Sequence, residues 1–259
     1  MTYYIGSKYN KGMNNHIKII SILFFLCSCS QNSIESIEAN KLVTPNFTGI
    51  DRIINCNLIN KSNLLNLELF FSRALSNEYF SKNHNDFFLK FYFPNTDFVN
   101  NFVMHIRYDQ ENNDFNNFIK ILSNEGFDEI ANCNFNTESL KSLSLLAFDY
   151  SISPIQSTEI LRCNYNEGYN YGTFRVSIEK LLIQMRSLKI PYSASYLNNN
   201  NNNDDDESFI WINNFYQLDH FDLIKENWII NNEAEEIKNE FLENAACLDS
   251  ETYQVVEII

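Results

Sequence analysis

The sequence predicts an α+β protein built from two consecutive β-α-β-β-α-β units. Short motifs recur in the same order in both halves, hydrophobic periodicity switches between strand and helix patterns, and four cysteines occupy matching positions. The chain has 259 residues, of which 44% are hydrophobic. It is therefore long enough for one large domain or two small ones with a hydrophobic core.

The internal repeat rests on three matched motifs that keep their order. The first two recur at an offset of 107 residues and the last at 114, so the second copy carries about seven extra residues. The matched motifs are "IINCN" (53–57) with "ILRCN" (160–164), "FVMHIRY" (102–108) with "FIWINNF" (209–215), and "EIANC" (129–133) with "ENAAC" (243–247).

Hydrophobic periodicity predicts the elements of the first unit, residues 51–152. Aromatic and β-branched runs indicate strands, and apolar residues three or four positions apart indicate helices. We expect strands at 52–58, 86–93, 101–109 and 144–151, and helices at 63–76 and 114–131, the second broken near Gly126. The first helix should bury Leu64, Leu67, Phe71, Ala74 and Leu75.

The second unit, residues 153–259, repeats this order. We expect strands at 158–165, 191–197, 208–216 and 252–259, a helix after Thr173, and a helical region that runs to Ala246. The helix after Thr173 should bury Ile178, Leu181, Leu182, Met185 and Leu188. The Asn/Asp-rich run 198–207 reads as a loop between two strands. Each unit thus has the ferredoxin-like order of elements.

Four cysteines suggest a disulfide framework. Each unit has one Cys at the end of its first strand and one just before its last strand, and these strands are antiparallel neighbours in a ferredoxin-like sheet. We therefore favour the pairs Cys56–Cys133 and Cys163–Cys247 among the three connectivities that four cysteines allow. Such bonds require an oxidising compartment. We expect no metal, because Cys-x-x-Cys pairs are lacking and the chain has only four histidines.

Residues 1–29 predict an export signal, with Met13 as an alternative start. Lys18 precedes an apolar run at 19–26, which is too short to span a bilayer but suits a signal peptide. The following "LCSC" (26–29) resembles the lipobox of bacterial lipoproteins. That resemblance implies acylation of Cys29; an ordinary secretory signal cut nearby is the alternative.

Residues 30–50 are polar and patternless and predict a tether between lipid and folded body. Cleavage before Cys29 would remove three Lys and no acid, which changes the net charge from −14 to about −17. Such a surface repels phosphate backbones and anionic headgroups, so we expect no nucleic-acid partner and attachment to the membrane only through the anchor. Ser30 after the acylated Cys favours the outer membrane, facing the periplasm.

Two ferredoxin-like units in one chain resemble the dimeric α+β barrel superfamily, in which two such sheets face each other around a barrel. The resemblance covers residues 53–259 and rests on the order of elements. It implies that the two units pack as a barrel within one chain. Members include NIPSNAP-like proteins, small cofactor-free monooxygenases and haem enzymes such as chlorite dismutase. None of their catalytic motifs can be placed on this sequence.

Two polar residues on an apolar strand are the only candidate site. In "FVMHIRY" (102–108), Val103, His105 and Arg107 share one face, which could point into a barrel, where an imidazole can act as base or ligand. We favour the simpler interpretation, in which His105 is hydrogen-bonded at a sheet edge and Arg107 is solvated. His84 and His220 fall in polar turns.

The sequence therefore predicts a lipid-anchored cell-envelope protein that acts as a binding or scaffolding module without a cofactor. Its partners would be the membrane, through the anchor, and either a small apolar ligand or a second copy of the chain. The alternative, implied by the superfamily, is a cofactor-free oxygenase-like or haem-linked enzyme that uses His105 and Arg107. An enzyme needs a cavity that reaches His105, whereas a scaffold can fill its interior with side chains.

Overall fold

A computed structural model describes most of the chain from Pro45 onward, within one compact unit that runs from Pro45 to Ile259. The described residues are 45–59, 61–74, 76, 87–95, 100–108, 115–147, 155–189, 191–199, 208–216 and 232–258. Several predictions fall outside them: the signal peptide with Met13 and Cys29, the tether up to residue 44, His84, His220, and residues 200–207 of the Asn-rich loop. No helix in the described part of the chain is long and apolar enough to cross a membrane.

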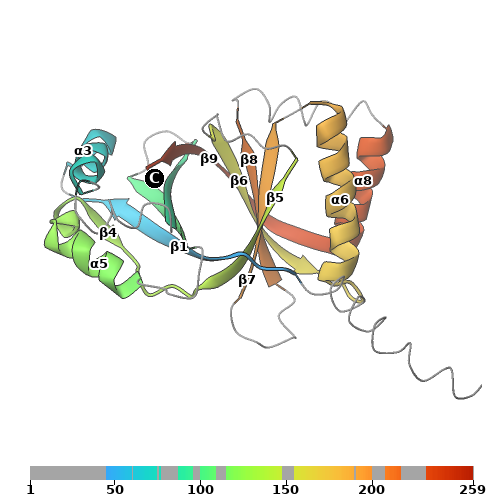
Figure 1. The fold of residues 1–259 in the computed structure, drawn as a ribbon, viewed down its shortest axis with the longest axis horizontal. Coiled ribbons are helices and arrows are strands. Elements are labelled where there is room, and N and C mark those ends of the chain that lie inside the picture. Colours follow the sequence, from blue (N-terminus) through green and yellow to red (C-terminus); the bar gives the residue numbers. More distant parts are fainter. Residues whose placement is uncertain are drawn as a thin grey trace, which may run out of the picture. The chain divides into compact units, whose positions relative to one another are not determined.

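Strands and helices follow the predicted order in both halves (Figure 1). The first half contains β1 (Gly49–Leu58), α3 (Leu64–Ala74), β2 (Phe87–Pro94), β3 (Asn101–Tyr108), α5 (Phe115–Asn124), the 3-10 helix η2 (Phe127–Glu129), β4 (Ala131–Cys133) and β5 (Leu140–Leu146). The second half contains β6 (Ser157–Tyr165), α6 (Tyr171–Ser187), β7 (Tyr192–Asn199), β8 (Ser208–Phe215), α8 (Asn232–Asn244) and β9 (Ala245–Glu257).

The strands close into a barrel. Their order is β3-β2-β9-β6-β8-β7-β5-β1-β4, and an additional β3–β1 pairing joins the ends. Each half has the ferredoxin-like order, β5-β1-β3-β2 in the first and β9-β6-β8-β7 in the second. The halves join where β2 pairs with β9 and β5 pairs with β7. The predicted fold, two ferredoxin-like units packed as an intrachain barrel, is confirmed.

Strand register is the same in the two halves. In the first half, β1 pairs with β3 so that Cys56 lies opposite Phe102 and Ile53 opposite His105. In the second half, β6 pairs with β8 so that the residues 107 positions later, Cys163 with Phe209 and Ile160 with Ile212, face each other. The sequence landmarks therefore occupy equivalent places in the two sheets.

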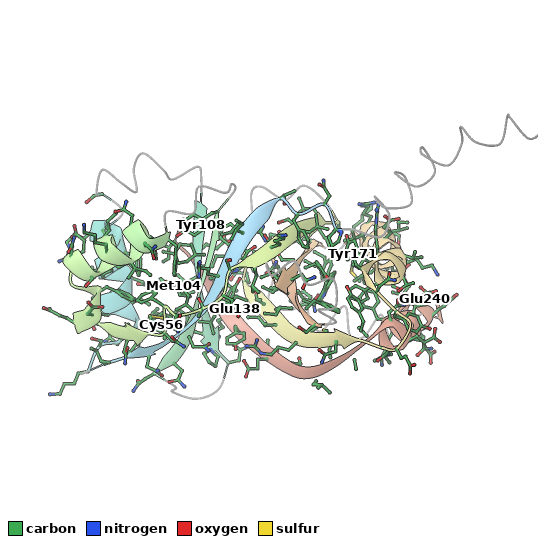
Figure 2. All side chains as sticks on the ribbon, turned by 90° about the horizontal axis from the view of Figure 1, so that it is seen from below. Cys56, Met104, Tyr108, Glu138, Tyr171 and Glu240 are labelled. Carbon is green, nitrogen blue, oxygen red and sulfur yellow. A yellow bond between two sulfur atoms is a disulfide. The ribbon has the colours of Figure 1, made fainter. Side chains whose placement is uncertain are left out.

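Three apolar clusters fill the described part of the molecule. One lies between the first half of the sheet and helices α3 and α5, and contains Phe71, Met104 and Phe118. The second lies between the other half and helix α6, and contains Phe174 and Trp211. The third, inside the barrel, consists of Tyr92, Val103, Ile160, Leu197, Ile212 and Tyr253. Figure 2 shows Met104 and Cys56 among the side chains of the first half and Tyr171 in the second.

Helix ends follow local chemistry. Helix α6 begins at Tyr171, earlier than the predicted start after Thr173, because Asn170 caps it and Thr173 completes a capping box. The predicted break near Gly126 is present: α5 ends at Asn124, and Gly126 has a φ of 85°, which favours glycine. The predicted stripe on α3 is partly wrong, because Leu64 is 40% exposed whereas Phe70 is buried.

The last strand of each unit starts earlier than predicted. Strand β9 begins at Ala245, directly after α8, so that Cys247 lies within the strand and opposite Cys163. In the first half, β4 first pairs with the end of β1, and β5 then crosses to pair with β7 of the other half. Pairing with distant strands thus outweighs the helix propensity of alanine at the start of β9.

Residues 45–50, at the end of the predicted tether, pack on the folded body. The Phe47 ring stacks on Tyr196 with 6.2 Å between centroids, and the Thr48 N–H donates to the Ser142 carbonyl at 2.8 Å. Gly49 and Ile50 already belong to β1. The folded body therefore begins a few residues before the predicted boundary at residue 51.

Both within-unit disulfides are present. Cys56 on β1 bonds Cys133 on β4, and Cys163 on β6 bonds Cys247 on β9. Each pair consists of directly opposite residues of two antiparallel strands. The cross-links therefore tie the first strand of each unit to the strand that follows its second helical region.

Replacing Cys56 and Cys133 together by Ser is expected to lower the free energy of unfolding by about 4 kcal/mol, since the disulfide closes a long loop in the unfolded chain. The two cysteines are 77 residues apart. Urea denaturation without reducing agent measures the loss. The variant that replaces Cys163 and Cys247, which are 84 residues apart, is the matched comparison and should lose a similar amount. Losses below about 1 kcal/mol in both variants would contradict this role.

Candidate functional site

Strand β3 directs its two faces to different cores. Met104 and Ile106 lie in the cluster under α3 and α5, and Val103 lies in the cluster inside the barrel. Because side chains alternate along a strand, His105 and Arg107 share the face of Val103 and point into the barrel. The structure thus places both candidate residues in the barrel interior.

His105 is held between two partners. Its side chain is 2% exposed, Nε2 lies 2.7 Å from Oδ1 of Asp51 on β1, and Nδ1 lies 2.6 Å from the hydroxyl of Tyr92 on β2. The Phe88 ring packs edge-on against the imidazole, with 5.2 Å between centroids. Because β3 pairs with both β1 and β2, His105 does not lie at a sheet edge, and that part of the favoured interpretation is wrong.

Arg107 is largely buried rather than solvated. Its side chain is 12% exposed, and its Nε donates to both carboxylate oxygens of Asp51 at 3.0 and 3.1 Å. Its Nη1 donates to the hydroxyl of Ser144, and its Nη2 lies 3.4 Å from the hydroxyl of Ser195. The predicted solvation of Arg107 is therefore wrong, because barrel closure brings Asp51 and the serines of β5 and β7 around it.

Asp51 is the residue that the sequence analysis missed. It is fully buried and lies directly opposite Arg107 in the register of β1 and β3. The signal was present in "GIDRIINCNL", where one acidic residue stands on the apolar first strand. An acid on a buried strand requires a charged or hydrogen-bonding partner. The predicted strands carry several cations, and only the strand register places Arg107 beside Asp51.

A glycine makes room for this pair. A Cβ on Gly49 would lie 2.9 Å from Oγ of Ser142 and 3.1 and 3.2 Å from the Cδ and Cγ of Arg107. The Arg107 side chain therefore crosses β1 where no side chain is present. Position 49 therefore tolerates a larger residue only if the Ser142 hydroxyl and the Arg107 side chain both move.

The charges of the network follow from its burial and its hydrogen bonds. Burial alone would raise the pKa of Asp51, but the hydrogen bond and charge of His105 and the charge of Arg107 hold it below its usual value. Burial lowers the pKa of His105, although Asp51 opposes this shift. Asp51 is therefore an anion and His105 is neutral. The carboxylate can only accept, so Nε2–H of His105 donates to Asp51, and the Tyr92 hydroxyl donates to Nδ1.

The neighbouring positions of the interior are also occupied. Lys90 on β2 forms an ion pair with Glu257 on β9 at 2.9 Å, and both Lys90 and Arg107 lie over the Phe88 ring, 4.7 and 4.9 Å from its centre. The apolar cluster that contains Tyr92 and Val103 fills the adjoining section of the barrel. The described contacts of the His105 ring are therefore all with side chains of the barrel interior.

His105 does not fit the role of a haem or metal ligand. Both ring nitrogens already have buried hydrogen-bond partners, so an incoming metal would have to displace Asp51 or Tyr92. The described residues contain no group of three or more His, Cys, Asp or Glu that could hold a metal ion. A general base needs a free ring nitrogen to accept a proton, and these two hydrogen bonds occupy both ring nitrogens.

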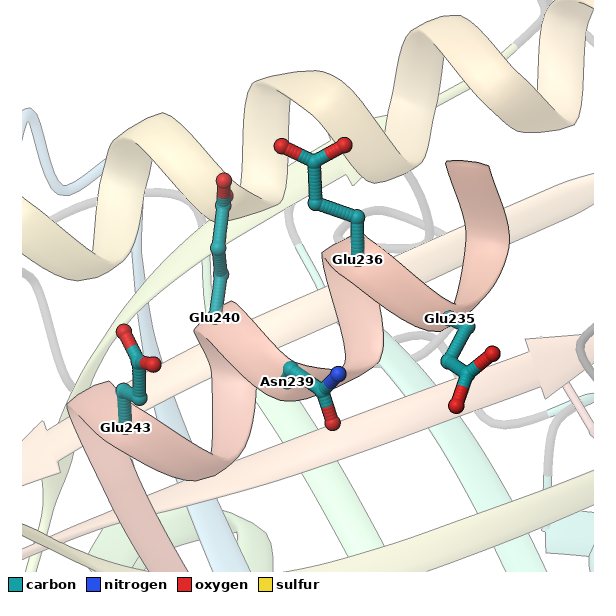
Figure 3. A pocket seen from close by; sticks show the side chains of 5 residues that line it. All are labelled: Glu235, Glu236, Asn239, Glu240 and Glu243. Atoms are coloured by element: carbon teal, nitrogen blue, oxygen red, sulfur yellow. The ribbon is translucent and has the colours of Figure 1, made fainter. Parts of the chain in front are cut away.

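A separate surface groove runs along α8 (Figure 3). It is lined by Glu235, Glu236, Asn239, Glu240 and Glu243. Glu240 is bound by Lys180 of α6, which neutralises part of the charge. A row of solvated carboxylates on one helix explains this groove without a ligand.

Comparison with solved structures shows which fold this chain shares. No protein-family model and no curated protein matches the chain. Solved structures match at low identity: a protein provisionally named a monooxygenase from Lactobacillus acidophilus NCFM (8% identity, TM-score 0.53, 82% of this chain and 95% of that chain) and a chlorite dismutase variant from Candidatus Nitrospira defluvii (7%, 0.53, 85% and 96%). A second provisionally named monooxygenase, from Fusobacterium nucleatum, matches at 8% with a TM-score of 0.50, over 83% of this chain and 94% of that one.

The fold is that of the dimeric α+β barrel proteins. In this protein one chain supplies both halves of the barrel. At such low identities the similarity shows a shared fold and says nothing about shared activity. The function of this barrel must therefore be argued from its own residues.

Replacing Asp51 by Asn is expected to lower the free energy of unfolding by about 3–5 kcal/mol, because it leaves the buried Arg107 without a counter-charge. Urea denaturation at neutral pH measures the loss. The matched control is Glu179→Gln, which also removes a carboxylate from an Arg Nε but on the exposed face of α6. The control should lose about 0.5 kcal/mol or less. Equal losses in the two variants would contradict a structural role of the buried pair.

The stability of the wild-type protein should fall as the pH drops below the ordinary His value of 6.5, because the unfolded chain binds a proton at His105 that the folded protein does not. The loss from this residue amounts to at most about 1.4 kcal/mol per pH unit. Asp51, whose pKa is also lowered, adds a further loss only below its ordinary value of 3.8. Urea denaturation at several pH values between 7.5 and 5 should show a shallower fall for His105→Gln. Identical pH dependence would contradict a neutral His105.

Proposed function

We propose that this protein is a lipid-anchored cell-envelope protein whose barrel acts as a non-catalytic binding or scaffolding module. The observation that carries the proposal is the state of His105. The imidazole has both nitrogens bonded inside a packed barrel, as expected for a structural residue. A module of this kind needs a stable framework more than an accessible base.

The disulfides support the envelope assignment. Cross-links between paired strands persist in the periplasm or at the cell surface and are rare in the reducing cytosol. The lipobox-like "LCSC" at residues 26–29 supplies a mode of attachment. The net charge of −14 agrees with an anchor rather than a basic patch as the membrane contact.

The second candidate function is an oxygenase-like or haem-linked enzyme. The observation in its favour is the hydrogen-bonded series Asp51–His105–Tyr92, a carboxylate, an imidazole and a phenol in contact. The burial of all three groups weighs against it, because a substrate or haem must reach the imidazole. The ultraviolet–visible spectrum of the purified full chain tests the haem-linked form of this candidate. Stoichiometric haem that is lost in His105→Gln would replace our proposal with the enzyme.

Acylation of Cys29 is tested by metabolic labelling with a palmitate analogue in a bacterial host. We expect the wild-type chain to be labelled and Cys29→Ser to lose the label completely, because the thiol is the acylated atom. Cys27→Ser is the matched control, since it changes the same residue type inside the same motif, and it should keep the label. Equal labelling of the Cys29→Ser variant, or no label on the wild-type chain, would overturn the anchor.

A further inference from the structure

Three serine hydroxyls lie where the polar network of the barrel ends. Ser144 on β5 and Ser195 on β7 accept hydrogen bonds from Nη1 and Nη2 of Arg107. Ser193 on β7 accepts from Nδ2 of Asn214 at 3.3 Å and from the hydroxyl of Tyr216 at 3.1 Å. In the described part of the chain these are the side-chain hydrogen bonds of the three serines, and in each the serine oxygen is the acceptor.

The three serines form one continuous stretch of the barrel wall. Ser144 lies directly opposite Ser195 in the register of β5 and β7. Ser193 precedes Ser195 by two residues and therefore points to the same side of the sheet. Ser193 and Ser195 are 5% and 7% exposed, whereas Ser144 is exposed. The stretch thus extends from the solvent to the buried interior.

Each of these hydroxyls has a proton to donate. A serine hydroxyl has one donor and two acceptor positions, and the described contacts use only acceptor positions. Accepting from a guanidinium polarises the hydroxyl and makes it a better donor. Ser193 is polarised in a similar way, because Thr158 donates to Asn214 at 2.9 Å and Asn214 in turn donates to Ser193. Three polarised donors on one wall are suited to an acceptor-rich group.

The orientation of Arg107 favours an anion. Its Nε is directed at Asp51, and its two terminal nitrogens are directed at Ser144 and Ser195. The carboxylate therefore lies on the far side of the guanidinium from the serines. A negative group on the serines would meet the cationic end of the Asp51–Arg107 pair first, at a place where low exposure weakens screening.

We propose that Ser144, Ser193 and Ser195, backed by Arg107, form a binding site for a small oxyanion, either a carboxylate or a phosphate group. The hydroxyls donate to the oxyanion, and the guanidinium supplies the complementary charge through them. This inference rests on the proposed function as a binding module, and it adds the chemical class of the ligand. It requires neither the lipid anchor nor any reaction at His105.

Isothermal titration calorimetry of the purified full chain tests this site, with inorganic phosphate and acetate as probes. We expect saturable binding of at least one anion. In the Ser193→Ala/Ser195→Ala variant that binding should weaken roughly 10- to 100-fold, as expected for the loss of hydrogen bonds to a charged group. The matched control is Ser157→Ala on β6, which is 5% exposed but points to the opposite face from Thr158. The control should bind like the wild type.

The outcomes separate this site from the proposed function. Tighter binding of phosphate points to a phosphoryl ligand and tighter binding of acetate to a carboxylate, and either result supports the site. No binding to the wild-type chain, or equal binding by all variants, overturns the site but leaves the anchor and the scaffold untouched, since palmitate labelling tests the anchor and the ultraviolet–visible spectrum tests for a haem enzyme. If circular dichroism shows that the double variant unfolds, Ser144→Ala at the exposed end replaces it, and unchanged affinity there overturns the proposal.

Discussion

The pairing of strand edges is the constraint on which the rest of this structure depends. Each ferredoxin-like half ends in two outer strands, β5 and β2 in the first half and β9 and β7 in the second. The outer edge of such a strand carries N–H and C=O groups that need partners or become sites of aggregation. Pairing β2 with β9 and β5 with β7 satisfies these groups within one chain. Closure also turns the inward faces of all the paired strands into a shared interior.

That interior explains the charged groups of the first half. Once the barrel closes, residues that would be solvated on an open sheet are buried, and burial of a charge is costly without a partner. Asp51 meets this requirement for Arg107, and Glu257 of the other half meets it for Lys90. His105 stays neutral between Asp51 and Tyr92. The network therefore links β1, β2 and β3 by side chains in addition to their backbone ladders, and its outer end leaves the serine donors of β5 and β7 available to a ligand.

The disulfides stabilise each half of the barrel separately. Each joins the first strand of its own half to the strand that follows the second helical region, β4 or β9, so neither cross-links the seams between the halves. The two sheets are stabilised separately, and the barrel seams depend on backbone pairing and on the apolar cluster around Tyr92 and Tyr253. This division suits a protein outside the cytosol, where covalent links persist and unfolding is difficult to repair. A stable body of this kind can display a binding surface without chemistry of its own.

The sequence by itself determined the order of the elements, the break at Gly126, the two cysteine pairs, and the face on which His105 and Arg107 lie. These features depend on periodicity and turn residues, which are local, or on motifs that recur along the chain. Only the tertiary structure decided that Arg107 is buried, that Asp51 is its partner and that β9 begins at Ala245. Asp51 and Arg107 are 56 residues apart, and their contact depends on the register of two strands and on barrel closure. Periodicity shows which side of a strand a residue occupies, but the partner across the sheet is set by long-range pairing.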